Sequence, residues 1–210
     1  MQLSIVPYVL QNQQLYELWP YAKGDQFKYF TQEAGNEHYK LLSHFSWQFP
    51  KGSTVIDIGT STGHSALALS HNPDINVITY NIVDEVANSN SIKSKGNINI
   101  RIKNCMDDID LLLKSPFIIL DVFHDGTFER IVIEKLIELN YGGIVMCDDI
   151  FLNKEMVDFW NWIPKTLTKI NTTEYGHWSG TGIILFGNSS LTITDIVQKP
   201  TPPYSQSDIQ

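Results

Sequence analysis

Short apolar runs alternate with segments of mixed polarity through the middle of this chain. Each run is rich in Ile or Val and ends near Gly, Asn or Asp, which is typical of buried strands that stop at a loop. The segments between them carry apolar residues at helical spacing. This alternation predicts an α/β fold with a Rossmann-like, doubly wound, mostly parallel sheet and helices on both faces. The expected strands are residues 54–58, 75–82 and 99–103, followed by one strand within each of the segments 116–126 and 142–151.

The last part of the pattern departs from this alternation. A helix expected over residues 154–167 is followed by two apolar runs, residues 168–175 and 181–187, and only the five residues 176–180 separate them. A link as short as this joins strands that run antiparallel. We therefore expect the sheet to close in a C-terminal antiparallel hairpin.

A glycine turn joins the first strand to an amphipathic helix. Residues 53–70 read STVIDIGTSTGHSALALS, with Asp57, Gly59 and Gly63 where strand gives way to helix. The turn lacks the GxxxxGK[ST] pattern of a phosphate-binding loop and the middle glycine of the dinucleotide pattern GxGxxG. The remaining D-x-G-x-x-x-G resembles motif I of class I S-adenosylmethionine-dependent methyltransferases. The resemblance implies that S-adenosylmethionine is the cofactor, with Gly59 and Gly63 beside its methionine part and Thr60 among its contacts. It also implies that Asp57 organises the turn.

The next two strands end in residues suited to the rest of this cofactor. The resemblance places a ribose contact after the second strand, where Asn81 and Asp84 follow the second glycine of the turn by 18 and 21 residues. The strand register favours Asn81, an amide where the family usually has an acid, although Asp84 or Glu85 could reach back instead. After the third strand, Asp107 is the candidate for the adenine amino group and Asp108 is the alternative. Asp84 and Asp107 are also suited to capping the helices that follow them.

Acidic residues follow the fourth and fifth strands. The segments PFIILDVFHDG and GGIVMCDDIF place Asp121 after the first and Asp148 and Asp149 after the second. This pattern resembles metal-dependent O-methyltransferases of the catechol and caffeoyl-coenzyme A type, and it implies that the three carboxylates bind Mg²⁺, a cation that prefers oxygen ligands. In those enzymes a basic residue three positions after the first acid, a lysine in the catechol enzymes, is the catalytic base, and this chain has His124 there, with Asp121 in the same reaction centre. Neighbouring strand residues point to opposite faces, so Asp148 and Asp149 can share one ion only if the strand has ended.

The resemblance also assigns roles to the two ends of the chain. The first 50 residues hold 11 of the 24 aromatic residues, and helices fit near 10–18 and 33–45. In small-molecule methyltransferases such an extension covers the cofactor crevice, and residues 36–39 are our candidates to face the cofactor. The expected domains are an N-terminal helical extension or lid (1–50), a methyltransferase core (51–190) and a flexible C-terminal tail (191–210).

The composition says more about the binding partners of the protein than about its fold. The 210 residues are 42% hydrophobic and 18% charged, as in one globular domain, and the net charge of −8 argues against nucleic acid, which attracts clustered Lys and Arg. Only two cysteines occur, and Cys147 lies in a core strand, so we expect reduced thiols and a cytoplasmic protein. No run reaches the roughly 20 apolar residues of a membrane span, and residues 1–10 do not resemble a signal peptide. We expect a small-molecule acceptor, no nucleic-acid or membrane partner, and a chain compatible with a homodimer. Asp125 and Glu129 are expected at the surface or in caps.

Together these features predict a methyltransferase that moves a methyl group from S-adenosylmethionine to a hydroxyl, or less readily an amine, of a small molecule. Two alternatives stay open. An NAD-dependent oxidoreductase is disfavoured by the missing middle glycine and by the final hairpin, which is the methyltransferase layout. A non-catalytic Rossmann-like binding protein remains possible because Asn81 replaces an acid.

Overall fold

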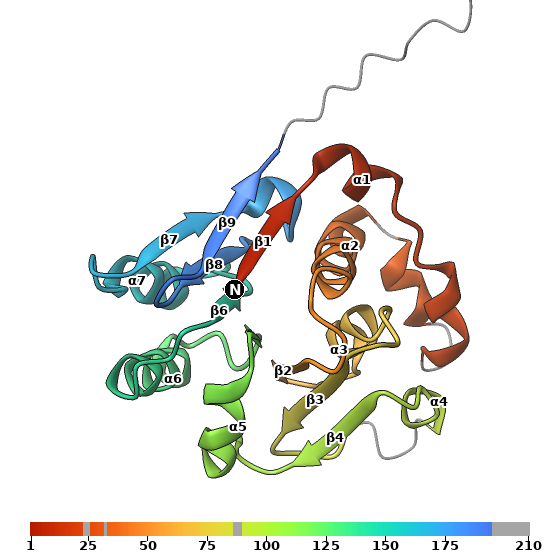
Figure 1. Ribbon diagram of the computed structural model, residues 1–210, viewed down its shortest axis with the longest axis horizontal. Helices are drawn as coiled ribbons and strands as arrows, with labels where there is room; N and C mark the ends of the chain where they lie inside the picture. The colour runs from red at the N-terminus through yellow and green to blue at the C-terminus, as the bar shows by residue number, and fades with distance from the viewer. Residues whose placement is uncertain (23–25, 32, 86–89, 195–210) are drawn as a thin grey trace, which may run out of the picture.

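The computed structural model describes residues 1–22, 26–31, 33–85 and 90–194, and its centre is a seven-stranded sheet (Figure 1). The strands are β2 (Thr54–Ile58), β3 (Asn76–Asn81), β4 (Ile98–Ile102), β5 (Phe117–Leu120), β6 (Ile144–Cys147), β7 (Thr168–Asn171) and β8 (Gly182–Leu185). Their order is β4-β3-β2-β5-β6-β8-β7, and neighbours are parallel except that β8 runs antiparallel to both β6 and β7. The expected doubly wound sheet with a final antiparallel hairpin is therefore confirmed.

Helices cover both faces of this sheet and enclose two cores. The helices are α2 (Glu33–Ser46), α3 (His64–Leu69), α4 (Asn90–Lys93), α5 (Ile109–Lys114), α6 (Thr127–Glu138) and α7 (Lys154–Trp162), with short 3-10 turns η3 (Cys105–Asp108) and η4 (Thr173–Tyr175). Successive strand residues point to opposite faces, so Ile56 of β2 packs with α5, α6 and α7 while Val55 packs with α2 and α3. None of the helices in the described ranges is long and apolar enough to cross a membrane.

The two ends of the described chain meet in a second, smaller sheet. Strand β1 (Gln2–Ile5) pairs in parallel with β9 (Ser190–Ile193) (Figure 1). Residues 191–193, which the sequence assigned to the tail, therefore belong to a strand. The proline-rich segment that begins at Gln198 lies outside the described residues.

The N-terminal extension folds into shorter helices than expected. Helix α1 (Pro7–Asn12) and the 3-10 helix η1 (Tyr16–Tyr21) replace the single helix expected over residues 10–18, and a second 3-10 helix, η2 (Gln26–Phe30), follows them. Pro7 stands in the first turn of α1, where a missing N–H costs nothing, and Pro20 disfavours an uninterrupted α-helix through η1. The expected helix near 33–45 is confirmed as α2.

Two further helices differ from the sequence-based expectation for identifiable reasons. Helix α3 is not amphipathic: all its residues are buried, because it lies between the sheet, α2 and η1. Helix α7 ends at Trp162 rather than near residue 167, because Ile163 precedes Pro164 and a residue before proline is driven out of the helical conformation.

Candidate active site

A cavity of about 600 Å³ opens at the carboxyl ends of β2, β3, β4 and β5. Strand β2 lies between β3 and β5, so the direction in which successive strands are added to the sheet reverses at β2. Such a switch point is where open α/β sheets bind ligands, and this volume is ordinary for a ligand site. Residues lining the cavity include Tyr39, Gly59, Thr60, Tyr80, Asn81, Glu85, Asn104, Cys105, Asp121 and His124.

The glycine turn after β2 is set by backbone contacts with β5. Gly59 has a φ of +108°, and a Cβ there would lie 1.4 Å from the carbonyl oxygen of Asp121. The Asp121 N–H donates to the carbonyl of Ile58 at 2.9 Å, which holds the two strand ends together. Gly59 thus leaves room for protein backbone as well as lining the cavity. Gly63, at the start of α3, is not among the lining residues; a Cβ there would meet the Ile92 side chain.

Asp57 is completely buried in β2 and is linked to the turn through two threonine hydroxyls. Thr79 of β3 donates to its Oδ2 at 2.5 Å, and the Thr79 and Thr60 hydroxyls lie 2.6 Å apart. Burial raises the pKa of the Asp57 carboxyl to about 6, although the Thr79 and Ser65 hydroxyls act in the opposite direction. This chain of polar contacts ties the cavity-lining Thr60 to two strands.

The raised pKa of Asp57 predicts a specific pH dependence of stability. Between the ordinary Asp pKa and about 6, the folded protein keeps a proton that the unfolded chain has released. This contribution is therefore full below about pH 4 and is lost as the pH rises through about 6. Asp57→Asn cannot titrate, so we expect its free energy of unfolding, relative to wild type, to rise by about 2 kcal/mol from pH 4.5 to pH 7.5. Urea unfolding of both proteins at each pH measures this, and a difference that stays constant with pH would contradict it.

The candidates for the ribose contact after β3 differ in whether they line the cavity. Asn81 and Glu85 both line the cavity, and the Asn81 Oδ1 accepts a hydrogen bond from the Ile82 N–H at 3.0 Å. Asp84 is exposed and is not among the lining residues. The acid that faces the cavity at the end of β3 is thus Glu85.

The candidates for the adenine contact after β4 also differ in whether they line the cavity. Asp107 is exposed and does not line the cavity, whereas Asn104 and Cys105 do. Asp107 is not the expected cap of α5 either, because the N-cap position there is Asp108, which makes no side-chain capping bond. Asn104 caps η3 instead, and its Oδ1 accepts from the Met106 N–H at 3.0 Å. The carboxylate of Asp108 accepts hydrogen bonds from three side chains of β3, β4 and the residues that follow β4: Lys103, Arg101 and Tyr80. These contacts, that of Lys103 foremost, lower its pKa to about 2.

The three aspartates expected to form the reaction centre follow β5 and β6 directly. Strand β6 ends at Cys147, and Asp149 has a φ of +56°. The backbone therefore leaves the extended conformation between Asp148 and Asp149, and the carboxylates can face the same region. This removes the sequence-based objection that strand neighbours point apart.

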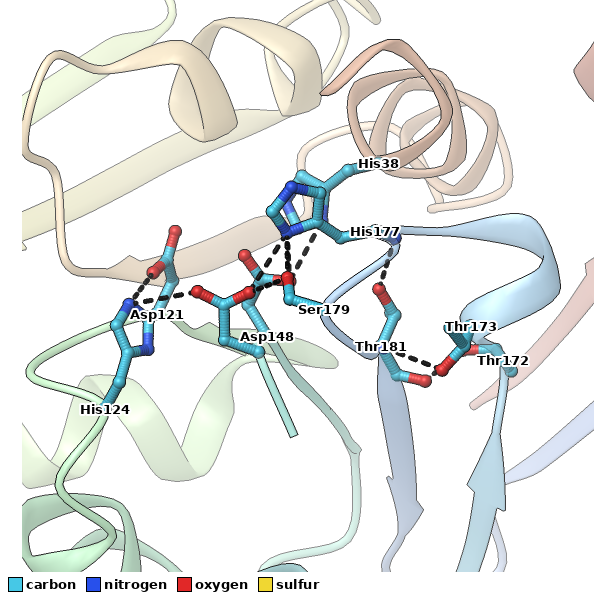
Figure 2. Close-up of polar contacts among 10 residues, drawn as sticks. His38, Asp121, His124, Asp148, Thr172, Thr173, His177, Ser179 and Thr181 are labelled. Carbon is cyan, nitrogen blue, oxygen red and sulfur yellow. Dashed lines mark hydrogen bonds and ion pairs between the residues drawn. The ribbon is translucent and has the colours of Figure 1, made fainter. Parts of the chain in front are cut away.

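Three histidines from different parts of the chain join these carboxylates (Figure 2). The Nε2 of His124 lies 3.3 Å from Asp121 Oδ1 and 3.4 Å from Asp149 Oδ2. The Nδ1 of His177, in the loop before β8, lies 3.0 Å from Asp149 Oδ1 and 3.8 Å from Asp148 Oδ1. His38 reaches over from α2, which places its Nδ1 3.4 Å from Asp148 Oδ1. We call these residues the carboxylate–imidazole cluster: Asp121, Asp148, Asp149, His38, His124 and His177.

Charge is crowded in this cluster. Burial raises the pKa of the Asp121 carboxyl well above its usual range, and the neighbouring carboxylates, Asp148 foremost, add to the effect. Burial would raise the pKa of Asp149 as well, but hydrogen bonds from His177 and Ser179 outweigh it and the pKa is lowered. The same contact with Asp149 raises the pKa of the His177 imidazole. The cluster thus contains both a carboxyl that resists ionisation and a carboxylate stabilised by its donors.

The backbone of His124 is held from two sides. It has a φ of +55°; its N–H donates to Glu129 Oε1 at 3.0 Å, and its carbonyl accepts from Asn153 Nδ2 at 2.8 Å. Glu129, which was expected at the surface or in a cap, is not at the surface, because its side chain is on the buried face of α6. Asp125 does act as a cap, accepting from the Thr127 N–H at 2.8 Å.

Two further sequence-based expectations concern residues 36–39, predicted to face the cofactor, and the two cysteines. His38 belongs to the cluster and Tyr39 lines the cavity, whereas Glu37 is not among the lining residues. The side chain of Asn36 lies outside the described residues. Both cysteines are buried and form no disulfide, as expected.

Comparison with known proteins identifies the fold. No protein-family model matches the chain, and no curated protein sequence matches it. Among solved structures, a candidate caffeoyl-CoA O-methyltransferase from Staphylococcus aureus is similar with a TM-score of 0.57 at 16% identity, over 71% of this chain and 82% of that one. The cofactor-bound protein Rv0187 from MTB is similar with a TM-score of 0.52 at 18% identity, over 78% and 81% of the two chains. The chain therefore has the Rossmann-like fold of the class I S-adenosylmethionine-dependent methyltransferases.

Proposed function

We propose that this protein is an S-adenosylmethionine-dependent methyltransferase that methylates a hydroxyl group of a small molecule, with a divalent cation at the carboxylate–imidazole cluster. The observation that carries the proposal is that the cavity and the cluster share residues. Asp121 and His124 line the cavity and also belong to the cluster. A methyl donor in the cavity and an acceptor at the cluster would thus meet at these two residues.

The cavity wall fits the proposed cofactor part by part. The turn around Gly59 and Thr60 offers backbone space for the methionine end, and Asn81 and Glu85 offer oxygen acceptors for ribose hydroxyls. Asn104 and Cys105 lie where the adenine would follow. S-adenosylmethionine supplies an electrophilic methyl group when bound, so the task left to the protein is to position the acceptor.

The cluster fits a cation because it leaves buried donor atoms unsatisfied. Asp148 Oδ1 and His38 Nδ1 have no hydrogen-bond partner among the described residues, although both residues are more than nine-tenths buried. A divalent cation at such a site lowers the pKa of a hydroxyl and orients it. Asp148 and Asp149 would hold the cation, and Asp121 would hold the ring of His124 toward the acceptor.

His124 is the proposed general base. Its Nε2 faces the carboxylates of both Asp121 and Asp149, which orient the imidazole, and the residue borders the cavity. An imidazole is suited to accept a proton near neutral pH. The exposed rings of Phe123, which lines the cavity, and Trp178, beside His177, offer apolar contacts to an acceptor.

Calorimetry tests the cofactor assignment directly. We expect S-adenosylmethionine and its demethylated product to bind the purified protein with micromolar affinity, and NADH not to bind. Radiolabelled methyl transfer to a panel of phenols, catechols and sugars then tests the reaction. Binding of NADH alone would favour the oxidoreductase, and binding of the methyl donor without transfer to any hydroxyl or amine in the panel would favour the non-catalytic binding protein.

The role of His124 gives a second test. His124→Asn removes the base but keeps a residue that tolerates a positive φ, so the loop should be preserved. We expect turnover to fall by roughly 100-fold or more, affinity for S-adenosylmethionine to change less than about twofold, and added imidazole to restore part of the rate. His71→Asn, which alters a histidine bound to Ser43 away from the cavity, is the control. Full turnover in His124→Asn would remove this residue from the mechanism.

A further inference from the structure

The carboxylate–imidazole cluster contains a compact set of mixed donor atoms. Asp148, Asp149 and His177 each offer one ligand atom, and these atoms lie within 4.8 Å of one another. Two are carboxylate oxygens and one is an imidazole nitrogen. Asp148 and Asp149 are buried and His177 is half-buried, so an ion here would be largely shielded from water.

A second observation points to an occupant of this set. Asp148 Oδ1 has no hydrogen-bond partner among the described residues, and neither does the His38 Nδ1 that faces it from 3.4 Å. Leaving buried polar atoms unsatisfied is costly, so native structures rarely do it without a reason. One cation between the two atoms would satisfy both, and His38 would add a second nitrogen donor.

Hydrogen bonding within the cluster explains only part of the arrangement. A charged His177 would pair with Asp149, and Ser179 also donates to Asp149. Both contacts use the Oδ1 of Asp149. They leave Asp148 Oδ1 and His38 Nδ1 without a hydrogen bond: the two atoms face each other at 3.4 Å, so protons alone account for them only through this long ion-pair contact.

The nature of the donors selects among divalent ions. Mg²⁺ prefers oxygen ligands in near-octahedral geometry, whereas imidazole nitrogen suits later first-row ions. We infer that Asp148, Asp149, His177 and His38 form a site for a divalent transition ion of the cobalt and zinc class, in preference to the Mg²⁺ expected from the sequence. The use of this ion in catalysis rests on the proposed methyltransferase function, but its binding does not.

The position of Asp149 connects this site to the proposed base. Asp149 faces His177 with Oδ1 and His124 with Oδ2. A bound ion would therefore lie one carboxylate away from the Nε2 of His124, which also faces Asp121. His38 lies on α2, so the ion would also fasten the N-terminal extension to the carboxyl edge of the sheet (Figure 2).

Metal titration without cofactor tests the inference. The full-length protein is stripped with EDTA, dialysed, and titrated separately with Co²⁺ and Mg²⁺ by calorimetry, with the visible absorption of Co²⁺ as a second readout. We expect Co²⁺ to bind with one-to-one stoichiometry, roughly 100-fold or more tighter than Mg²⁺, and to show the visible bands of a nitrogen-ligated ion that Zn²⁺ displaces. Equal affinities for Co²⁺ and Mg²⁺, or no Co²⁺ binding, would overturn the inference and leave a cluster held by protons.

Variants assign the donors. His177→Ala and His38→Ala are each expected to weaken Co²⁺ binding by about tenfold or more and to alter its spectrum, while His71→Ala does neither. If both variants bind Co²⁺ as wild type does, the proposed donor set is wrong. Where a variant fails to fold, the wild-type spectrum still decides whether Co²⁺ has nitrogen ligands.

The same preparation separates this inference from the proposed function. Binding of S-adenosylmethionine without a preference for Co²⁺ would overturn the metal inference alone. Tight Co²⁺ binding without any affinity for S-adenosylmethionine would overturn the proposed function alone.

Discussion

Gly59→Ala is expected to destabilise the protein by more than about 4 kcal/mol and to abolish binding of S-adenosylmethionine. The added Cβ would lie 1.4 Å from the carbonyl oxygen of Asp121 and 2.6 Å from its carbonyl carbon. These are backbone atoms, so no change of rotamer relieves the overlap. Separating the strands would break the hydrogen bond from the Asp121 N–H to Ile58 and move Asp121 out of the cluster. The φ of +108° adds strain of its own.

Gly52→Ala provides a matched control for this variant. Gly52 also has a positive φ, +82°, but nothing lies within 4 Å of a Cβ built there. It should cost only the strain of the left-handed conformation, about 1–2 kcal/mol, and leave cofactor affinity unchanged. Urea unfolding and calorimetry measure both effects. Similar losses in the two variants would show that backbone strain, not contact with Asp121, makes glycine necessary at position 59.

The parts of the fold that local patterns specify could be predicted from the sequence. The apolar run of β2 is confirmed at the expected residues, and the short link between β7 and β8 correctly required the two strands to be antiparallel. The pairing of β1 with β9 could not be predicted. It joins two four-residue strands from opposite ends of the described chain, and nothing in either short segment indicates its partner.

The candidate site was predictable where strand ends specify it. Asp121, Asp148 and Asp149 follow directly after β5 and β6, and parallel strands bring their carboxyl ends to one edge of the sheet. His124 shares that edge because it lies three residues after Asp121. The conformation of Asp149 that lets both neighbouring carboxylates face this edge has no signature in the sequence.

The burial of Glu129 and the position of His177 each had a signal that sequence reasoning could have used. Glu129 lies three, four and seven residues before Val132, Ile133 and Leu136, which is the spacing of one helix face, so its burial follows from that pattern. His177 precedes β8, and an antiparallel β8 begins where β6 ends: Gly182 pairs with Cys147. The hairpin itself therefore brings His177 to Asp148 and Asp149. The contact of His38 with Asp148 depends on how α2 packs over the sheet and has no such local signal.

Asp148→Asn is expected to lower turnover by about 1,000-fold or more while leaving the metal-stripped protein at least as stable as wild type. The Asp148 carboxyl is buried, and its Oδ1 accepts no hydrogen bond among the described residues and only faces His38 and His177 at ion-pair distance. It also adds to the crowding of charge that raises the pKa of Asp121. An amide of the same shape removes that repulsion, so we expect the free energy of unfolding of the metal-stripped protein to rise by about 1 kcal/mol. It also removes the anionic ligand on which cation binding depends.

Opposite changes in stability and turnover distinguish a ligand-binding carboxylate from a structural one. A residue retained for its ligand weakens the protein when that ligand is absent, whereas a structural residue stabilises it under all conditions. Asp125→Asn is the matched control, since Asp125 is exposed and caps the Thr127 N–H, a role that asparagine also fills. Urea unfolding in EDTA and methyl transfer at saturating S-adenosylmethionine give the two readouts. If Asp148→Asn loses stability in EDTA yet keeps its turnover, Asp148 supports the fold and the cation must bind elsewhere.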